Sequence, residues 1–176
     1  FANCKNQVAD LTDYPSSSTI GDYAFSSNVN LKTVKFSQSI ASSTSIIVGN
    51  YAFANNKNLG TVTLPNANIY SANKDDSGNP ILAEGLFAES GTSTTEGIPV
   101  EIPDAMEKIG AKMFYLAKIE SIKLGNVQTI GDKAFSQYDD SSKIYTNNYV
   151  DDENGITIPG TTEEIGTDSF RGLKIK

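Results

Sequence analysis

The chain has 176 residues, of which 38% are hydrophobic, and it carries a net charge of −7 with no His and one Cys. The hydrophobic fraction excludes a disordered chain, and no apolar run approaches the ~20 residues of a membrane span. The negative charge opposes binding to the phosphate backbone of nucleic acids. One Cys forms no internal disulfide, and without His or a Cys pair we expect neither a zinc nor a haem site.

In chain order, the first predicted element is a strand at Val8–Thr12, and a repeated unit follows it. Residues 20–36, IGDYAFSSNVNLKTVKF, and residues 48–64, VGNYAFANNKNLGTVTL, are identical at nine of 17 positions. The first half of the unit is a turn of the form apolar-Gly-x-x-small-Phe. The second half ends in alternating apolar residues, which indicates a short strand with one buried face. A repeat of this length is typical of a solenoid of stacked coils.

The unit recurs less perfectly through the rest of the chain. The turn returns at four places, which are residues 82–87, 109–114, 130–135 and 165–170. Further strands are expected at residues 98–102, 119–124 and 156–159. Seven of the eight Phe residues occupy the last turn position, namely Phe1, Phe25, Phe53, Phe87, Phe114, Phe135 and Phe170. Because residues 1–6 align with residues 53–58, we expect one solenoid domain over 1–176 that is truncated within a repeat at both ends.

Three segments that break the repeat are interpreted as insertions, near residues 66–81, 88–97 and 136–154. The first is rich in Asp, Ser, Gly, Asn and Pro, which predicts a hairpin or surface loop with Tyr70 near its base. The third contains the alternating stretch KIYTNNYV, which predicts a second hairpin.

The repeat resembles the BspA-like branch of the leucine-rich-repeat family, whose repeats read roughly L-x-x-I-x-I-P-x-x-V-x-x-I-G-x-x-A-F-x-x-C. The best matches are Leu59–Pro65, the trio Met106, Ile109 and Gly110, the series Val127, Ile130, Gly131, Ala134 and Phe135, and Phe1–Cys4. The resemblance implies an α/β repeat, in which a curved solenoid carries short parallel strands on its concave face and short helical or irregular turns on its convex face. The family's Cys position holds Cys4, Asn28, Asn56, Ser90, Ala117 and Tyr138, so we expect no cysteine ladder.

No residue pattern indicates a reaction. A Ser or Thr nucleophile would lack its usual His partner, and acids on flexible loops are a poor support for a glycosidase pair. Residues 74–79 and 151–155 concentrate oxygen ligands near a Gly, but neither has the D-x-[DN]-x-[DN]-G spacing of a calcium loop. We therefore expect no enzyme, cofactor or metal, with a structural calcium at these loops as the alternative.

The resemblance also implies a function. The resemblance to BspA-like proteins suggests a non-enzymatic binding module that is extracellular or on a bacterial cell surface. Such a module would adhere to other cells or to host matrix or plasma proteins such as fibronectin and fibrinogen. One alternative is a structural spacer that carries another domain. Another is a catalytic parallel β-helix acting on polysaccharide, although the predicted strands lack the clustered basic and acidic groups that such an enzyme needs. Neither a nucleic-acid partner nor membrane insertion is expected.

The expected binding residues lie in the third insertion, where rigid Tyr rings stand beside acids that would steer a basic partner. They are Tyr138, Tyr145, Tyr149, Asp139, Asp140, Asp151 and Asp152. Tyr23 and Tyr51, in contrast, are expected to pack locally within their turns. The alternative site is the outward face of the concave strands, with Lys35, Thr63, Glu101 and Lys123 in one row beside Thr12 and Thr157. A second row is expected to hold Asp10, Thr33, Thr61, Pro99, Ser121 and Gly155.

Overall fold

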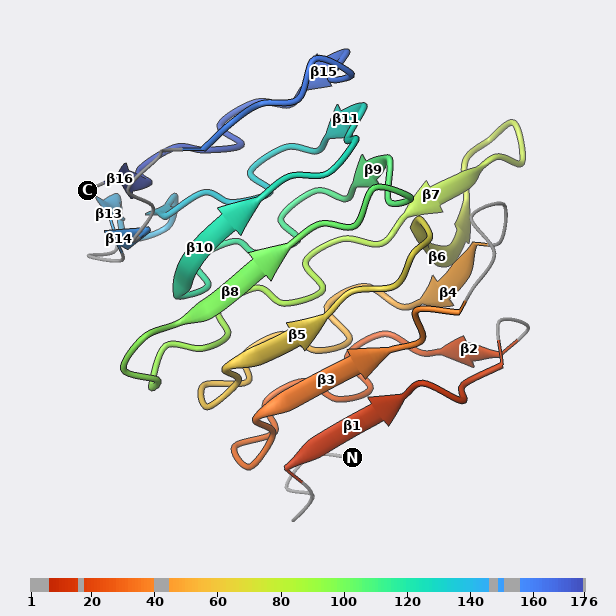
Figure 1. Cartoon of the computed structure of the whole chain (residues 1–176), viewed down its shortest axis with the longest axis horizontal. Coiled ribbons are helices and arrows are strands. Elements are labelled where there is room, and N and C mark those ends of the chain that lie inside the picture. The colour runs from red at the N-terminus through yellow and green to blue at the C-terminus, as the bar shows by residue number, and fades with distance from the viewer. Residues whose placement is uncertain (1–6, 16–17, 40–44, 146–148, 151–155, 176) are drawn as a thin grey trace.

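The computed structural model describes residues 7–15, 18–39, 45–145, 149–150 and 156–175. Within them the chain winds in successive coils, so that equivalent strands of neighbouring coils lie side by side (Figure 1). The first layer of strands comprises β1 (Val8–Leu11), β3 (Thr33–Phe36), β5 (Thr61–Thr63), β8 (Ile98–Glu101) and β10 (Ile119–Lys123). β3 pairs in parallel with both β1 and β5, and β8 pairs in parallel with β10. The predicted solenoid of parallel strands is confirmed.

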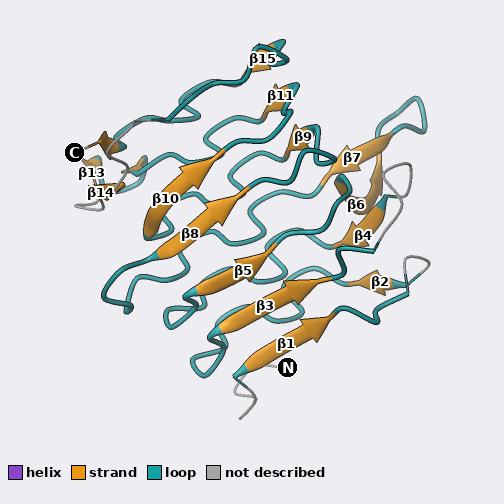
Figure 2. Cartoon of the chain, in the orientation of Figure 1, coloured by secondary structure: helices purple, strands orange, loops and turns teal. Residues whose placement is uncertain are grey.

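A second parallel layer lies where helical or irregular turns were expected (Figure 2). It is built from short strands that end at the apolar residue before the turn glycine, namely β2 (Thr19–Ile20), β4 (Ile46–Val48), β9 (Lys108–Ile109), β11 (Thr129–Ile130) and β15 (Glu164–Ile165). β4 pairs with β2, and β11 pairs with both β9 and β15. No helix occurs in the described residues, so the α/β assignment is not confirmed for this part of the chain. Its turns are hydrogen-bonded but not helical.

A column of stacked Phe rings runs between the two layers. The rings of Phe25, Phe53, Phe87, Phe114, Phe135 and Phe170 stack in sequence, with neighbouring centroids 5.1 to 5.8 Å apart. The four inner rings are fully buried, with an exposed fraction of 0%. The column therefore contains every Phe of this series that the structure describes, with Phe25 and Phe170 only partly buried at its ends, and Phe1 lies outside the described residues.

The turn glycine has a packing reason. A Cβ placed on Gly110 would lie 2.0 Å from the carbonyl oxygen of Ala83, one coil away. The equivalent Cβ on Gly49 would lie 2.2 Å from the backbone nitrogen of Asp22. Neighbouring backbones therefore approach each other more closely at this position than any side chain allows. This contact explains why the motif places glycine here.

The turns themselves also form a ladder between coils. In each turn, the residue two before the Phe adopts a left-handed conformation, with φ between 52° and 57° at Tyr23, Tyr51, Lys112, Lys133 and Asp168. The N–H of Tyr23 donates to the carbonyl of Asn50 in the next coil, and the N–H of Tyr51 donates to Glu84. The turn backbone is thus satisfied by the following coil, which leaves the side chains to face outward.

Polar side chains fill the interior position that cysteine holds in the family pattern. Asn56 donates from Nδ2 to the carbonyls of Phe25 and Phe53, and its Oδ1 accepts the N–H of Asn28. Ser90 continues this column. The assignment of Tyr138 to the interior position is wrong, because the fully buried side chain there is Gln137, which donates to the carbonyl of Ala117.

The insertions differ in how they attach. In the first, β6 (Ile69–Lys74) and β7 (Pro80–Leu82) pair in antiparallel, so the predicted hairpin is present. The second insertion is held by Lys118, whose Nζ donates to the carbonyls of Thr94 and Thr95 at 2.6 and 2.8 Å. In the third, β12 (Tyr138–Asp139) pairs in antiparallel with β13 (Ile144–Tyr145).

The last coil departs from expectation. The predicted strand at residues 156–159 is not formed. Instead β14 (Tyr149–Val150), inside the third insertion, pairs in parallel with β16 (Lys174–Ile175).

The register of the first strands corrects one of the expected rows. Val8 lies opposite Thr33, and Asp10 lies opposite Lys35. Asp10 therefore belongs to the row of Lys35, Thr63, Glu101 and Lys123, and not to the row of Thr33. The core residue opposite Val34 is the small Ala9, whereas the prediction had centred this strand on Leu11.

Candidate functional site

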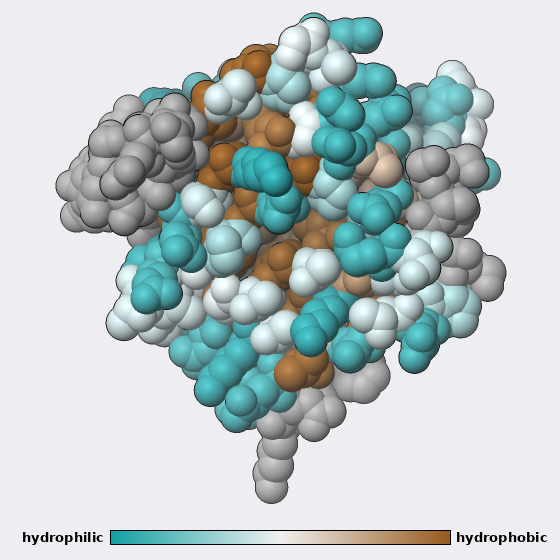
Figure 3. Space-filling model, viewed as in Figure 1, coloured by the Kyte–Doolittle hydropathy of each residue, from teal (hydrophilic) through white to brown (hydrophobic). Residues whose placement is uncertain are grey.

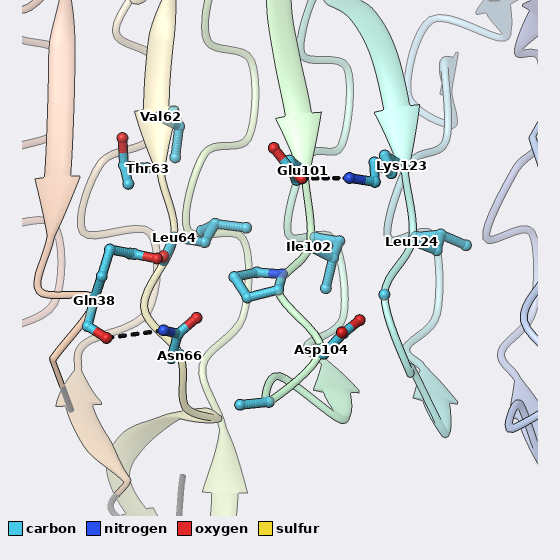
Figure 4. Close-up of a pocket in the computed structure, with 13 residues that line it drawn as sticks. Gln38, Val62, Thr63, Leu64, Asn66, Glu101, Ile102, Asp104, Lys123 and Leu124 are labelled. Carbon is cyan, nitrogen blue, oxygen red and sulfur yellow. Dashed lines mark hydrogen bonds and ion pairs between the residues drawn. The ribbon is translucent and has the colours of Figure 1, made fainter. Parts of the chain in front are cut away.

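Two open grooves among the described residues have the largest volumes of those considered as ligand sites. The first, which we call the sheet groove, has a volume of about 720 Å³ and lies where β5, β8 and β10 end (Figure 4). Aliphatic side chains line it, with amides and charged groups around them, and these residues include Val62, Leu64, Ile102, Leu124, Gln38, Asn66, Glu101, Asp104 and Lys123. Figure 3 shows the same face, with hydrophobic surface exposed between polar side chains over the middle of the first layer.

The sheet groove lies beside a break in the first layer. β5 pairs only with β3, and β8 pairs only with β10. The backbone N–H of Ile98 points toward β10 and donates to the carbonyl of Lys118. Because successive N–H groups of a strand point in opposite directions, the backbone nitrogen of Pro99 points toward β5. Proline has no N–H to donate to a neighbouring strand. The break therefore follows from a proline on the β5 side of β8.

The charges beside the sheet groove compensate one another. Lys123 Nζ lies 2.6 Å from Glu101 Oε1, and both side chains are at least 70% exposed. Along the corrected row, Asp10 lies beside Lys35 on paired strands, and Glu101 lies beside Lys123. Exposed pairs of this kind contribute little energy and leave little net charge to attract a partner. Of the four residues of the alternative site, the sheet groove brings together Thr63, Glu101 and Lys123, and Lys35 does not line it.

The second groove, which we call the turn groove, follows the outer surface of the turns and has a volume of about 670 Å³. Its floor is the small residue after each Phe, namely Ser26, Ala54 and Ala88. One wall consists of residues two before the Phe, which are Tyr23, Tyr51, Lys112 and Lys133. The other consists of residues two after the Phe, which are Ser27, Asn55, Glu89 and Leu116. Tyr115 and the segment Asp139–Ser141 line one end.

The tyrosine wall is held in place by contacts between coils. The rings of Tyr23 and Tyr51 stack at 5.5 Å and are nearly parallel. Tyr51 Oη donates to Glu84 Oε1 at 2.6 Å, and Lys112 Nζ donates to the same oxygen at 2.7 Å. Gly85 makes room for this arrangement, because a Cβ there would lie 2.2 Å from the Tyr51 ring. Burial and then the hydrogen bond to Glu84 raise the pKa of Tyr51 to about 12.

We expect Glu84→Gln to lower the pKa of Tyr51 from about 12 toward its ordinary value. The substitution removes the negative charge beside the phenol, but burial still raises the pKa, so the shift is partial. Because the folded pKa lies above the unfolded one, the neutral phenol stabilises the wild-type fold below pH ~10, and this stability is lost as the pH rises through ~12. An NMR titration of the Tyr51 ring measures the change, with Glu163→Gln as control. An unchanged pKa in Glu84→Gln would show that Glu84 does not act on Tyr51.

The third insertion is tied to the end of the turn groove that Tyr115 lines. Asp140 forms an ion pair with Lys133, and its backbone N–H donates to Tyr115 Oη at 3.3 Å. The Lys133 ammonium lowers the pKa of Asp140. Asp139 accepts hydrogen bonds from Ser142 and Ser141, which lower the pKa of its carboxyl to about 2. The insertion therefore contributes fixed carboxylates to a groove that the turns build.

The predicted binding residues are only partly brought together. Asp139 and Asp140 line the turn groove, whereas Tyr138 does not, and the guanidinium of Arg171 lies 3.7 Å from its ring centroid. Tyr145 is located by β13 and Tyr149 by β14. Asp151 and Asp152 lie outside the described residues.

The prediction missed the groove's own aromatic residues, Tyr23, Tyr51 and Tyr115. Tyr23 and Tyr51 were each expected to pack within their own turns, and Tyr115 was not considered. The available signal was their common position in the repeat: Tyr23 and Tyr51 both stand two residues before the Phe. Equivalent residues of a solenoid form a column, so two aromatics at one position predict a stacked pair.

The first insertion contains one of the two loops at which a structural calcium was the alternative. Asp75 Oδ1 accepts the backbone N–H groups of Ser77 and Asn79, and its Oδ2 accepts the Asn79 side chain. These hydrogen bonds close the hairpin tip, and they use the Asp75 carboxylate that a calcium ion there would need as a ligand. Within the described ranges, no three His, Cys, Asp or Glu residues lie together as metal ligands would. The second candidate loop, residues 151–155, lies outside these ranges.

Stacked parallel coils with a continuous Phe column define a repeat protein of the solenoid class. Residues 1–75 match the family model described as BspA type Leucine rich repeat region, with six copies of the repeat. Such repeats are generally non-catalytic protein-interaction modules and are typical of bacterial surface proteins. No curated protein and no solved structure matches the chain. Among the described residues, no helix is long and apolar enough to span a membrane.

Proposed function

We propose that this chain is a non-enzymatic adhesion module of an extracellular or cell-surface protein, and that it binds host matrix or plasma proteins or other cells through the turn groove. The observation that carries the proposal is the composition of this groove. It places three Tyr side chains, two of them stacked, beside a floor of small residues and the fixed carboxylates of Asp139 and Asp140. Aromatic anchors beside a recess are typical of the energetic centre of a protein interface.

The sheet groove supports this function less well. Its lining contains no aromatic residue, and its Glu101–Lys123 pair is exposed and self-compensated. A surface of this kind offers a partner no aromatic anchor, and its one charge beyond the pair is that of Asp104. For the same reason, a catalytic β-helix acting on polysaccharide is not favoured.

The proposal is tested by filling each groove with one large side chain. Ser26→Trp places an indole on the floor of the turn groove, at a repeat position that already holds Tyr115 in another coil. Thr63→Trp is the matched control and fills the sheet groove. In binding to immobilised fibronectin or fibrinogen, we expect Ser26→Trp to weaken adhesion about ten-fold or more, since blocking an anchor site costs at least ~1.4 kcal/mol.

The two variants distinguish the alternatives. Thr63→Trp should bind as tightly as wild type. If Thr63→Trp loses binding and Ser26→Trp retains it, recognition belongs to the sheet groove. If the wild-type chain binds neither coat nor cells, the spacer alternative replaces the proposal. Circular dichroism and thermal melting of both variants show whether each remains folded.

A further inference from the structure

The turn groove has the shape of a channel for an extended chain. Resting on the proposed function, we infer that it receives a short extended peptide segment of the partner that carries a basic side chain. From Tyr23 to Tyr115 the groove runs across four successive coils, and Lys133 of the fifth coil lines its end. Neighbouring coils are 5.1 to 5.6 Å apart at their Phe rings, and three such steps match about five extended residues at ~3.3 Å each.

The groove recognises side chains and not the peptide backbone. On its floor and walls, the N–H groups that a bound strand would use are already engaged. The N–H of Ser27 donates to Ala54, that of Asn55 to Ala88 and that of Glu89 to Tyr115. The bound segment therefore cannot extend a sheet, and its affinity must come from the tyrosine wall and from charge.

The charges of the groove favour a cation. Both lysines of the first wall are neutralised by short contacts, Lys112 by Glu84 and Lys133 by Asp140. Asp139 differs, because its hydrogen bonds come from the neutral donors of Ser141 and Ser142.

The opposite wall carries a second weakly compensated carboxylate. Lys57 Nζ lies 3.8 Å from the Glu89 carboxylate and donates to the Glu89 carbonyl at 3.3 Å, and the two side chains are 40% and 54% exposed. Two other cations lie near the end of the groove that Tyr115 lines. Arg171 forms an ion pair with Asp168, and Lys143, like Lys133, lowers the pKa of Asp140. Among the residues that line the groove, two lysines stand against three carboxylates, those of Glu89, Asp139 and Asp140, so the lining carries a net charge of −1, to which a guanidinium or ammonium group is complementary.

The test uses three blocked pentapeptides, identical except for Arg, Gln or Glu at the central position. Each is titrated into the ¹⁵N-labelled chain, and the amide shifts of Ser27, Asn55 and Glu89 report on the groove. We expect the Arg peptide to bind roughly five-fold more tightly than the Glu peptide at low salt, with the difference shrinking as salt is added. The Gln peptide should lie between them.

The origin of the preference is tested by removing the two charges. In Glu89→Gln/Asp139→Asn the Arg and Glu peptides should bind equally, and the Asn side chain can still accept the bonds from Ser141. The matched double variant Glu163→Gln/Glu164→Gln changes the net charge equally at the β15 edge and should keep the preference.

Two results would overturn the inference: a Glu peptide that binds as tightly as the Arg peptide, or peptide-induced shifts confined to the sheet groove. If the peptides leave the turn groove unperturbed while Ser26→Trp still weakens adhesion to the protein coat, this inference fails and the proposed function stands. If Ser26→Trp leaves adhesion intact, the proposed function itself fails.

Discussion

Replacing Phe53 by alanine is expected to lower the free energy of unfolding by about 3–5 kcal/mol. Phe53 is fully buried and stacks on both Phe25 and Phe87, at 5.1 and 5.6 Å, while the ring of Phe36 meets it edge-on at 5.8 Å. Removing the ring leaves a cavity within the column that the rigid coils on either side cannot close. Urea unfolding followed by circular dichroism measures the loss.

The matched control is Tyr23→Ala. This ring also stacks on its neighbour in the next coil, but its side is open to solvent and the residue is 60% exposed. The loss should be about 1 kcal/mol or less. Equal losses in the two variants would contradict the assignment of the Phe column as the core.

The second large effect is expected at Gly110. Gly110→Ala should destabilise the fold by about 1–3 kcal/mol or more, because its Cβ would lie 2.0 Å from the carbonyl oxygen of Ala83 and would force the two coils apart. The same substitution at a permissive glycine usually stabilises slightly, by ~0.4–1 kcal/mol, through the unfolded chain.

Gly160 provides the permissive control. Among the described residues, no heavy atom outside its immediate neighbours lies within 4 Å of a Cβ built there. Gly160→Ala should therefore leave the melting temperature nearly unchanged. A Gly110→Ala variant that melts with wild type would show that the coils are not in close backbone contact at this glycine.

The part of the fold that was predictable from sequence is the part that repeats. The apolar-Gly-x-x-small-Phe spacing located the Phe column, and alternating residues such as Val34 and Phe36 located the first layer. The second layer was missed because two-residue strands such as Thr129–Ile130 are too short to show alternation. The resemblance instead suggested turns that are partly helical.

Two further errors have local physical causes. The register of β1 was displaced because its core residue opposite Val34 is Ala9, a side chain too small to stand out beside Leu11. The sheet groove was not foreseen, although its signal was present. The prediction considered only the Pro99 side chain, which it placed in a continuous outward row. The backbone nitrogen of Pro99 points toward β5, and it has no hydrogen to donate to that strand.

The turn groove was unpredictable for a different reason. It has no local motif, because each coil contributes only single residues from the same repeat positions, such as Tyr23 and Tyr51 on the wall and Ala54 on the floor. Its shape emerges only when the coils are stacked in register. The sequence singled out the acids of the third insertion, but the ion pair between Asp140 and Lys133 that brings Asp139 and Asp140 to the groove depends on how the insertion folds back.

The most direct test of the proposed binding surface is hydroxyl-radical footprinting of the chain alone and in the presence of fibronectin or fibrinogen. Three exposed side chains serve as reporters, with exposed fractions of 60% for Tyr23 at the turn groove, 46% for Val8 on the first layer and 41% for Ile158. Recognition at the turn groove predicts that binding strongly reduces oxidation of Tyr23 and leaves Val8 and Ile158 unchanged. Protection of Val8 with Tyr23 still fully oxidised would contradict it.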